Sequence, residues 1–240
     1  MNIIGVIPAR YGSSRFPGKP LVKIKGKPMI QHVYERARLS KKLDEVVVAT
    51  DHRIIYDTVK SFGGKVIMTK TDHESGSDRI AEVSERIDGD IFVNIQGDEP
   101  LINPQLIDQI IEEAKKNLNY VVTAKTKIRE KADITNPNVV KVVTDLQNNA
   151  LYFSRLPIPY NRSNENIEYY KHLGIYCYSK SILQHFVKMP KSRYEKCEVL
   201  EQLRLLENGF KIKVINTNYD SVGVDTPEDV MKIEKLLEEK

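Results

Sequence analysis

The stretch IIGVIPARYGSSRFPGKP, residues 3–20, joins a run of apolar residues to a loop that is rich in cations. The apolar run has the composition of a short strand buried on both faces. The notable loop residues are the cations Arg10, Arg15 and Lys19 and the glycines Gly12 and Gly18. Glycine-containing turns beside cations suit phosphate oxygens, and open α/β sheets bind ligands beyond the carboxyl ends of their strands. The stretch therefore predicts a phosphate-binding loop, with a basic surface loop as the alternative.

The first half of the chain alternates short apolar runs with amphipathic segments. The runs expected to be strands are 3–7, 45–50, 65–68, 90–95 and 120–125. The segments expected to be helices are 28–39, 52–62, 78–87 and 103–116. Several of the strands are almost wholly apolar, as in parallel sheets that are covered on both faces. This order predicts an α/β fold with a mostly parallel sheet and helices on both faces.

The regular alternation weakens after residue 126. Here we expect strands at 139–144, 150–154, 173–178 and 211–216, helices at 179–188 and 196–207, and a polar loop at 161–166. The residues Thr226-Pro227-Glu228-Asp229 predict the start of the last helix, because they supply a cap residue, a proline in the first turn and two acids. We therefore interpret the chain as one domain, 1–240, with a core at 1–125 and 211–240 and a smaller inserted lobe at 126–210.

The composition is that of a globular protein, and its mild positive charge would suit a small anionic substrate. Of the 240 residues, 40% are hydrophobic and 29% are charged, and the net charge is only +4. The positive and negative residues are interleaved, so nothing demands nucleic acid as a partner. Cys177 and Cys197 form no CxxC pair, which is typical of reduced thiols in the cytoplasm. No stretch resembles a signal peptide or a membrane span, so we expect a cytoplasmic protein without membrane insertion.

Two aspartates follow apolar runs at positions where a metal ligand is expected. Asp98 lies in NIQGDEP, 94–100, directly after the strand expected at 90–95. Asp225 lies in GVDTPED, 223–229, directly before the last helix. Mg²⁺ typically takes one or two protein carboxylates together with substrate phosphates. Both aspartates also fit ordinary turns, so the spacing leaves a shared metal and a structural role open.

Several common catalytic signatures are absent from the sequence. The five histidines, His32, His52, His73, His172 and His185, show no metal-ligand spacing, and most are expected to be surface or packing residues. Pro20 follows Gly18-Lys19, so the opening loop is no Walker A loop, and neither GxGxxG nor GxSxG occurs. A covalent nucleophile is not expected. The remaining chemistry is displacement at phosphorus by positioning and charge neutralisation.

The opening stretch resembles the N-terminal signature of sugar-activating nucleotidyltransferases. Further blocks resemble the members that activate 3-deoxy-manno-octulosonate (Kdo): KPMIQHVYERA, VATDH, HESGSDR, NIQGDEP, NPNVVKVV, ALYFSRLPIPY, KHLGIYCY, LEQLRLLENG and GVDTPED. They follow one another over nearly the whole chain. The resemblance implies a Rossmann-like, three-layer fold of the nucleotide-diphospho-sugar transferase type, and a homodimer formed through the smaller lobe.

The resemblance also implies a reaction and its site residues. CTP and Kdo would give CMP-Kdo and pyrophosphate, for lipopolysaccharide biosynthesis, by in-line attack of the sugar's anomeric hydroxyl on the α-phosphate with help from Mg²⁺. The residues implied for CTP are Pro8, Ala9, Arg10, Arg15, Lys19, Gly76, Ser77, Arg79 and Gln96. Those implied for Kdo are Arg155, His172, Tyr176, Glu201 and Gln202. Asp98 and Asp225 would hold Mg²⁺ and, with Lys19 and Arg15, form the catalytic set.

Local chemistry agrees with the implied sugar site. His172 and Tyr176 are four apart on an expected strand, so their side chains share a face. The planar guanidinium of Arg155 suits a sugar carboxylate, although a structural ion pair is equally consistent with it. Glu201 and Gln202 open a helical turn, from which they can reach sugar hydroxyls. Tyr176 in the core and Glu201 on a solvated helix face are the corresponding structural interpretations.

Other functions fit the same residues. The same scaffold activates other acidic sugars, such as 8-amino-Kdo or a sialic acid, and the blocks HLGIY and LEQLR favour a Kdo-type substrate. A nucleotide-binding protein without catalysis would have little use for both Asp98 and Asp225. A glycosyltransferase would have little reason for the Arg15 and Lys19 loop.

Overall fold

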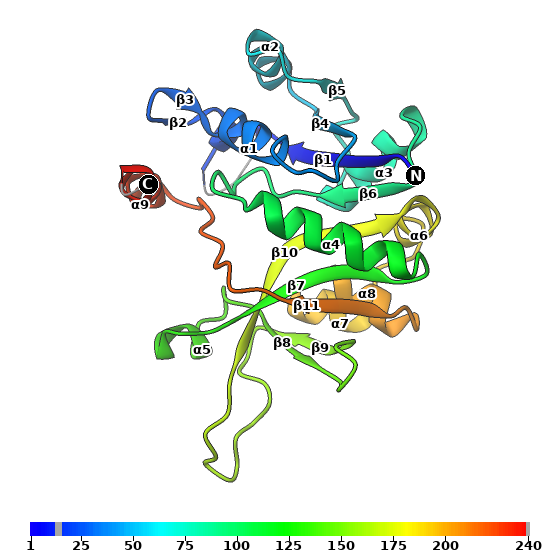
Figure 1. Ribbon diagram of the computed structural model, residues 1–240, viewed down its shortest axis with the longest axis vertical. Helices are drawn as coiled ribbons and strands as arrows, with labels where there is room; N and C mark the ends of the chain where they lie inside the picture. Colours follow the sequence, from blue (N-terminus) through cyan, green and yellow to red (C-terminus); the bar gives the residue numbers. More distant parts are fainter. Residues whose placement is uncertain (13–15, 239–240) are drawn as a thin grey trace. The chain divides into compact units, whose positions relative to one another are not determined.

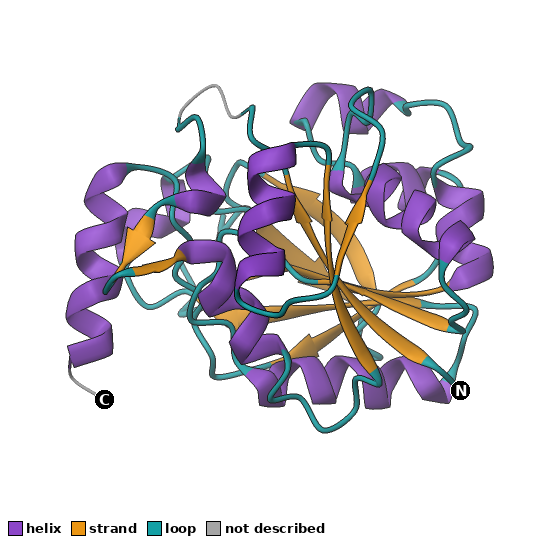
Figure 2. Ribbon diagram, turned by 90° about the horizontal axis from the view of Figure 1, so that it is seen from above, coloured by secondary structure: helices purple, strands orange, loops and turns teal. Residues whose placement is uncertain are grey.

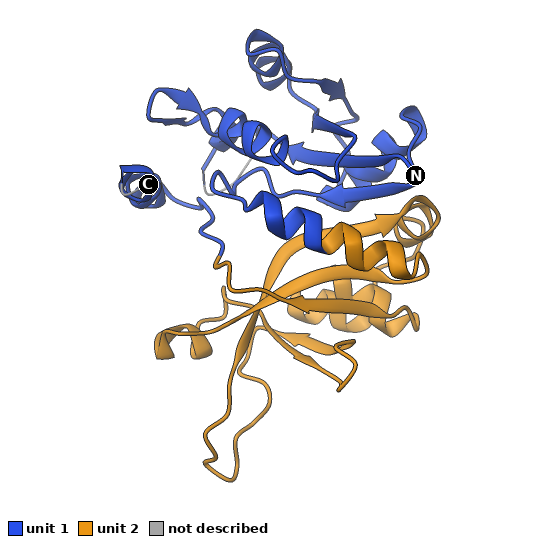
Figure 3. Ribbon diagram, viewed as in Figure 1, with its two compact units in different colours: residues 1–109, 221–240 blue, residues 110–220 orange. Residues whose placement is uncertain are grey.

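The structure is a computed structural model that describes residues 1–12 and 16–238. It is a mixed α/β protein with a mostly parallel central sheet, as the sequence predicted. The chain divides into two compact units (Figure 3). Unit 1 contains residues 1–109 and 221–240, and unit 2 contains residues 110–220. Arg15, one of the predicted phosphate ligands, lies outside the described residues.

The unit 1 strands of the large sheet are all parallel. β1 (Ile3–Ala9) pairs with β4 (Glu45–Thr50) on one side and with β6 (Ile91–Asn94) on the other, and β5 (Val66–Met68) extends the sheet beyond β4 (Figure 1). Almost every residue of β1, β4 and β6 is buried. Each fully buried Val or Ile contributes about 1.5–3 kcal/mol, which explains why these runs are apolar without alternation. Because the strands are parallel, their carboxyl ends meet at one edge.

Helices lie on both sides of the strands (Figure 2). In unit 1, α1 (Met29–Ala37) packs on β1 and β4, α2 (Arg53–Ser61) packs on β4 and β5, and α3 (Gly76–Arg86) packs on β1, β4 and β6. α4 (Pro104–Lys116) continues from unit 1 into unit 2. All four helices were predicted, with boundaries that differ by at most two residues.

The C-terminal segment returns to the opening of the chain within unit 1. A short hairpin of β2 (Lys23–Ile24) and β3 (Lys27–Pro28) follows the one-turn helix η1 (Lys19–Leu21), and α9 (Pro227–Glu238) packs on β2. The sequence analysis missed η1 and the hairpin. The shared apolar cluster consists of Ile24, Met29, Leu101, Val224 and Ile233. This packing brings residues near 20, 100 and 225 into one neighbourhood.

In unit 2 the central strand is β7 (Val121–Lys127). It pairs in parallel with β11 (Ile212–Asn216) and antiparallel with β10 (Tyr170–Ser179). β8 (Lys141–Thr144) pairs antiparallel with β9 (Ala150–Ser154) and meets β10 at one position. The predicted lobe, 126–210, is therefore shorter than the observed unit, 110–220. The difference arises because β7 and β11 bond to each other and so belong to the same unit.

The predicted continuous helix over 196–207 is wrong. The structure has two short helices there, α7 (Arg193–Glu198) and α8 (Gln202–Glu207), and a left-handed residue, Val199, at φ 54 between them. Arg155 donates from Nε to the carbonyl of Glu198 at 2.6 Å and from Nη2 to the carbonyl of Val199 at 3.3 Å. These contacts satisfy carbonyls that a helix end leaves without partners. The other helices of unit 2 are α5 (Lys131–Thr135) and α6 (Lys180–Phe186).

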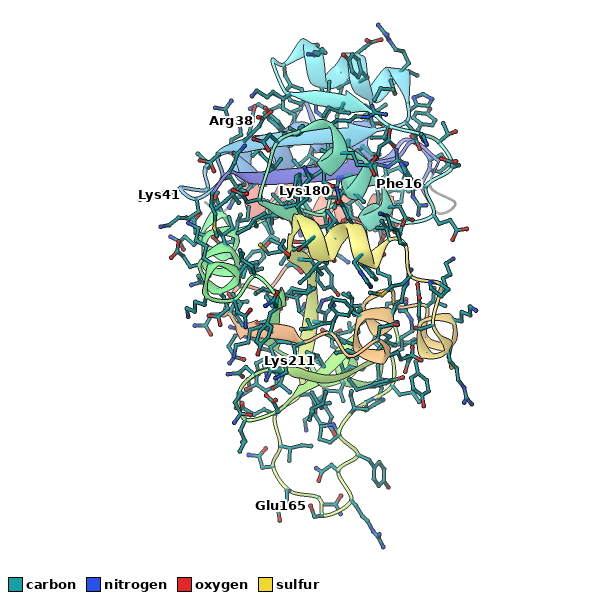
Figure 4. The ribbon with its side chains drawn as sticks, turned by 90° about the vertical axis from the view of Figure 1, so that its right-hand side faces the viewer. Phe16, Arg38, Lys41, Glu165, Lys180 and Lys211 are labelled. Atoms are coloured by element: carbon teal, nitrogen blue, oxygen red, sulfur yellow. The ribbon has the colours of Figure 1, made fainter. Side chains whose placement is uncertain are left out.

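Residues 155–169 of unit 2 form a long excursion without helix or strand. Glu165 lies near its tip (Figure 4). The excursion contains the polar loop that was expected at 161–166. Among the described residues, no helix has both the length and the apolar character needed to cross a membrane.

Candidate functional site

A cavity of about 280 Å³ lies in unit 1 beside the ends of β1 and β6. Its walls come from four parts of the chain: the end of β1 with the loop after it, the start of α3 with the segment that enters it, the turn after β6, and Asp225 in the segment before α9. The lining residues are Pro8, Ala9, Arg10, Lys19, Pro20, His73, Glu74, Ser75, Gly76, Arg79, Gln96, Gly97, Asp98 and Asp225. The site therefore lies at the strand edge where open α/β sheets bind ligands.

One ammonium group joins the two predicted metal ligands. Lys19 Nζ donates to Asp98 Oδ2 at 2.6 Å and to Asp225 Oδ1 at 3.3 Å. The Lys19 side chain is 15% exposed, while the two carboxylates are 34% and 56% exposed. The structure thus brings Asp98 and Asp225 to one cation, although they lie far apart in the sequence.

Backbone contacts explain why the two carboxylates meet. A Cβ on Gly97 would lie 2.7 Å from the carbonyl oxygen of Pro8, so only glycine allows this turn to lie against the end of β1. The amide of Val224 donates to the carbonyl of Asp98 at 2.9 Å, which holds the segment before α9 beside the turn. The amide of Asp225 in turn donates to Asp229 Oδ2 at 3.1 Å. Both aspartates are therefore fixed by the main chain.

The two carboxylates are a suitable donor set for Mg²⁺. Hard carboxylate oxygens from one or two residues, completed by water and substrate phosphates, are its usual protein ligands. Within residues 1–12 and 16–238, no three His, Cys, Asp or Glu side chains gather as metal ligands. The Lys19 ammonium occupies the position between the two carboxylates that a metal cation bound to both of them would take. The residues therefore fit a metal that arrives with a substrate better than one held by protein ligands alone.

The start of α3 forms a second wall of the cavity. Ser75 caps the helix: its hydroxyl accepts from the amide of Asp78 at 3.1 Å, and Asp78 accepts from the amide of Ser75 at 2.9 Å. This reciprocal pair is a capping box, and it starts the helix two residues before the predicted position. Gly76, the first helical residue, lines the cavity. A helix N-terminus of this kind favours anionic ligands.

Two buried charged residues of α3 hold the segment that leads to this wall. Arg79 donates from Nη2 to Asp51 Oδ2 at 2.7 Å, and its Nη1 binds the hydroxyl of Thr69 and the carbonyl of Lys70. One turn later, Glu82 Oε2 accepts from the amide of Lys70 at 2.9 Å and pairs with His73 Nε2 at 2.5 Å.

Glu82 is ionised in this environment. Burial alone would raise the pKa of its carboxyl, but the hydrogen bonds from His73 and the Lys70 amide and the charge of Arg86 lower the pKa below its ordinary value. The carboxylate thus accepts from three groups. Glu82 and Arg79 together fix residues 69–73.

Most of the predicted CTP residues meet at this cavity. Those that line it are Pro8, Ala9, Arg10, Lys19, Gly76, Arg79 and Gln96. Ser77 is buried behind the wall and is not among the lining residues. The donors of Arg79 are engaged by Asp51, Thr69 and Lys70, which indicates that this residue shapes the wall.

The sequence analysis missed five lining residues: Pro20, His73, Glu74, Ser75 and Gly97. His73 had been grouped with histidines that were mostly expected on the surface or in packing. Its position as the first residue of HESGSDR was the sequence signal that could have identified it as a cavity residue. Gly97 was likewise visible as the glycine before Asp98.

The predicted sugar residues all lie in unit 2. The rings of His172 and Tyr176 lie 5.2 Å apart between centroids, as their shared face predicted. β10 shifts its register between Leu173 and Tyr176, and Thr123 fills the irregularity by donating to the carbonyl of Ile175 at 2.8 Å. The Tyr176 hydroxyl is buried and has no hydrogen-bond partner among the described residues. It is the kind of orphaned polar group that a ligand satisfies.

Both of these side chains are neutral. Burial lowers the pKa of His172 to about 3, and it raises the pKa of Tyr176 well above its ordinary value, with further contributions from Tyr178 and Glu201. His172 Nε2 lies 3.0 Å from the hydroxyl of Thr123. Neutral, fixed groups of this type suit hydroxyl-rich ligands.

The other three predicted sugar residues occupy the α7–α8 region. Glu201 is the N-cap residue of α8, without a side-chain cap hydrogen bond to any described residue, and Gln202 is the buried first residue, so the two residues open a helical turn as predicted. Arg155 binds the carbonyls of Pro137, Glu198 and Val199. Three of its five N–H donors are thereby engaged in holding the chain.

Comparison with known proteins shows the family of this chain. A family model described as Cytidylyltransferase matches residues 4–213. The chain belongs to the cytidylyltransferase family. A 3-deoxy-manno-octulosonate cytidylyltransferase of Thermodesulfovibrio yellowstonii is 53% identical over 99% of this chain and 98% of its own length. An 8-amino-3,8-dideoxy-manno-octulosonate cytidylyltransferase of Shewanella halifaxensis is 50% identical over 99% of both chains.

A solved structure shows the same similarity in three dimensions. It is a CMP:2-keto-3-deoxy-manno-octonic acid synthetase in complex with CTP, 46% identical to this cytidylyltransferase-family chain. The similarity has a TM-score of 0.95 and covers 100% of this chain and 99% of the other. It confirms the predicted nucleotidyltransferase fold.

Substitution of Gly97 tests whether the close approach to β1 positions the turn after β6. We expect Gly97→Ala to lower the free energy of unfolding by about 1–3 kcal/mol, because the new methyl group meets a backbone carbonyl that cannot move aside. Urea denaturation measures the change. Gly223→Ala is the matched control, since its Cβ would lie 3.9 Å from the carbonyl of Asp98 and make ordinary contact. An equal loss in the two variants would contradict the interpretation.

The half-buried, neutral His172 predicts a loss of stability in acid. Its pKa is about 3 in the folded protein and about 6.5 in an unfolded chain, so the unfolded state binds more protons between these values. The free energy of unfolding should therefore fall as the pH drops below about 6.5, by at most about 1.4 kcal/mol per pH unit from this residue. Urea denaturation at pH 7.5 and pH 5 measures it. His172→Gln should reduce the slope, whereas His185→Gln, at an exposed site, should leave it unchanged.

Proposed function

We propose that this chain transfers the cytidylyl group of CTP to Kdo and releases pyrophosphate. The observation that carries the proposal is the pair Asp98 and Asp225, held on one cation in a cavity that Arg10 also lines. The support from relatives is the 53% identical Kdo cytidylyltransferase and the 46% identical synthetase in complex with CTP.

The proposed reaction is a single displacement at phosphorus. The anomeric hydroxyl oxygen of Kdo attacks the α-phosphorus of CTP, and the bond from that phosphorus to the bridging oxygen of the β-phosphate breaks. The hydroxyl gives up its proton to solvent water, and pyrophosphate leaves with the electron pair of the broken bond. No enzyme-bound intermediate forms. Catalysis then consists of positioning and charge neutralisation, which a cavity with fixed charges supplies.

The residues of unit 1 take the nucleotide in this proposal. Arg10 and the N-terminus of α3 bind phosphate oxygens, and Lys19 exchanges its carboxylate partners for phosphate oxygens when CTP binds. Asp98 and Asp225 would hold Mg²⁺, which when bound neutralises phosphate charge and lowers the pKa of a coordinated hydroxyl. Arg15, outside the described residues, stays a predicted ligand of the triphosphate.

The residues of unit 2 take the sugar in this proposal. His172 and Tyr176 offer neutral hydrogen-bonding groups, and the orphaned Tyr176 hydroxyl gains a partner when a sugar hydroxyl binds. Glu201 and Gln202 supply further acceptors and donors at the start of α8. Arg155 stays a predicted ligand of the sugar carboxylate, with two N–H donors left beside its three carbonyl contacts.

A second candidate substrate is 8-amino-Kdo. The relative that carries this sugar in its name is 50% identical to this chain, close to the 53% of the Kdo relative. The chemistry at phosphorus would be the same, and only the group at C8 of the sugar would differ. The homodimer, the cytoplasmic location and the role in lipopolysaccharide biosynthesis stay predictions.

Pyrophosphate release tests the proposed function directly. With CTP and Mg²⁺, we expect release that depends on Kdo, and mass spectrometry should identify CMP-Kdo. Parallel reactions with 8-amino-Kdo and N-acetylneuraminate compare the alternative sugars. Faster release with 8-amino-Kdo would show that 8-amino-Kdo is the preferred substrate. No release with any sugar, despite CTP binding, would contradict the proposed activity.

Substitution of the two carboxylates tests the proposed metal site. Asp98→Asn and Asp225→Asn should each lower turnover by at least about a hundredfold, because a carbonyl oxygen is a weaker Mg²⁺ ligand than a carboxylate. Each variant should also weaken Mn²⁺ binding in the presence of CTP, measured by electron paramagnetic resonance. Asp57→Asn is the control, since this exposed carboxylate pairs with Arg53 on α2. Near-native turnover and Mn²⁺ binding in either active-site variant would argue against the site.

A further inference from the structure

The proposed metal ligand Asp225 lies in a part of unit 1 that has no regular structure. Residues 221–225 form neither helix nor strand, and the Asp225 side chain is 56% exposed. An exposed side chain on an irregular segment loses conformational freedom when it binds a ligand, and this loss weakens the binding. A strong metal ligand at this position therefore needs neighbouring groups that fix the segment in advance.

The carboxylate of Asp229, in the first turn of α9, is such a group. Its Oδ2 accepts from the amide of Asp225 at 3.1 Å, from the amide of Thr226 at 3.0 Å and from the hydroxyl of Thr226 at 3.2 Å. Its Oδ1 accepts from Lys232 Nζ at 2.9 Å. The Asp229 side chain is 19% exposed, so water competes little for these bonds.

The contacts of Asp229 go beyond the capping of a helix. In a capping box, the acid at the third helical position accepts from the amide of the cap residue. Asp78 of α3 accepts in this way from Ser75 at 2.9 Å. Asp229 does the same for Thr226, and it also reaches one residue farther back, to the amide of Asp225. The additional bond fixes the main chain of the proposed metal ligand.

Helix α9 gives Asp229 a firm support. Its residue Ile233 is fully buried in the apolar cluster of unit 1. Glu234 Oε1 accepts from the amide of Lys25 at 2.9 Å, in the turn between β2 and β3. This hairpin directly follows η1, which begins at Lys19. The helix that carries Asp229 is thus bound to the same stretch of chain as the ammonium group of the site.

We propose that Asp229 is a positioning residue of the metal site. By binding the amides of Asp225 and Thr226, its carboxylate fixes the course of the main chain at Asp225 and keeps that side chain directed at the cation shared with Asp98. The inference rests on the proposed function in one respect, namely that Asp225 binds the metal ion that accompanies CTP. Loss of a group that orients a metal ligand typically weakens metal binding about 10- to 100-fold.

A role in helix capping alone predicts a different pattern of variants. Thr226→Val removes the cap hydroxyl but leaves both amides bound to the Asp229 carboxylate. Asp229→Asn keeps the size of the side chain, but it removes the charge and turns one oxygen into an NH₂ group that cannot accept from an amide. Both changes weaken the cap, and only the second releases Asp225.

Mn²⁺ binding in the presence of CTP and without sugar, measured by electron paramagnetic resonance, tests the inference. We expect Asp229→Asn to weaken Mn²⁺ binding at least about tenfold. Thr226→Val should change it by less than about twofold, although both variants lower the urea midpoint of unfolding because each loses part of the cap. Glu228→Gln is the control for charge, since it removes one exposed carboxylate from the same turn of α9, and it should also stay within about twofold.

The outcomes separate the inference from the proposed function. Equal weakening by Asp229→Asn and Thr226→Val would reduce Asp229 to a helix cap, and equal weakening by Asp229→Asn and Glu228→Gln would show a general effect of charge. Either result would overturn the inference. If Asp225→Asn weakens Mn²⁺ binding and Asp229→Asn does not, the inference fails and the metal site stands. If Asp225→Asn has no effect, both fail.

Hydrogen exchange reports on the contact itself. In the unaltered protein, we expect the amides of Asp225 and Thr226 to exchange at least about tenfold more slowly than in an unstructured chain, because each is bound to Asp229. The Asp225 amide should stay slow in Thr226→Val. Nuclear magnetic resonance measures both rates. An unprotected Asp225 amide in the unaltered protein would overturn the inference without any variant having to fold.

Discussion

The contact between Lys19 and the two aspartates is the interaction on which the edge of unit 1 depends. Two carboxylates that reach the same ammonium repel each other, and at an effective dielectric of about 20 the repulsion between unit charges about 4 Å apart is about 4 kcal/mol. A cation between them removes this cost. A positive charge, whether an ammonium or a metal ion, therefore stabilises the place where the opening loop, the turn after β6 and the segment before α9 meet, in addition to their backbone and apolar contacts.

Helix α3 serves the same cavity in two ways. Its N-terminus, capped by Ser75, lines the cavity, while its buried face carries Arg79 and Glu82 beside apolar residues. Burying such charges is costly unless each is paired and hydrogen-bonded. Here each one binds backbone groups of the segment before His73. The helix thus packs on the sheet and also fixes a cavity wall.

The two units present different chemistry. Unit 1 concentrates full charges, which suit a triphosphate and its metal. Unit 2 offers neutral groups, the half-buried His172 with a pKa of about 3 and the buried Tyr176 with its orphaned hydroxyl. Neutral donors and acceptors suit sugar hydroxyls, because the desolvation free energy of an isolated buried charge would exceed the free energy gained from its hydrogen bonds to hydroxyls. In the proposed reaction, charge acts on the nucleotide and hydrogen-bond geometry acts on the sugar.

The sequence by itself predicted the strands of the large sheet, the four helices of the first half and the two aspartates as candidates, because these depend on local patterns of apolar residues and on loop positions. It also marked most of the nucleotide residues through motifs that lie beside strand ends. Only the tertiary structure decided that the helix expected over 196–207 breaks at Val199, where Arg155 binds the freed carbonyls. Only it placed Lys19 between the aspartates and His73 on Glu82, because contacts between distant segments follow from packing, which no local pattern contains.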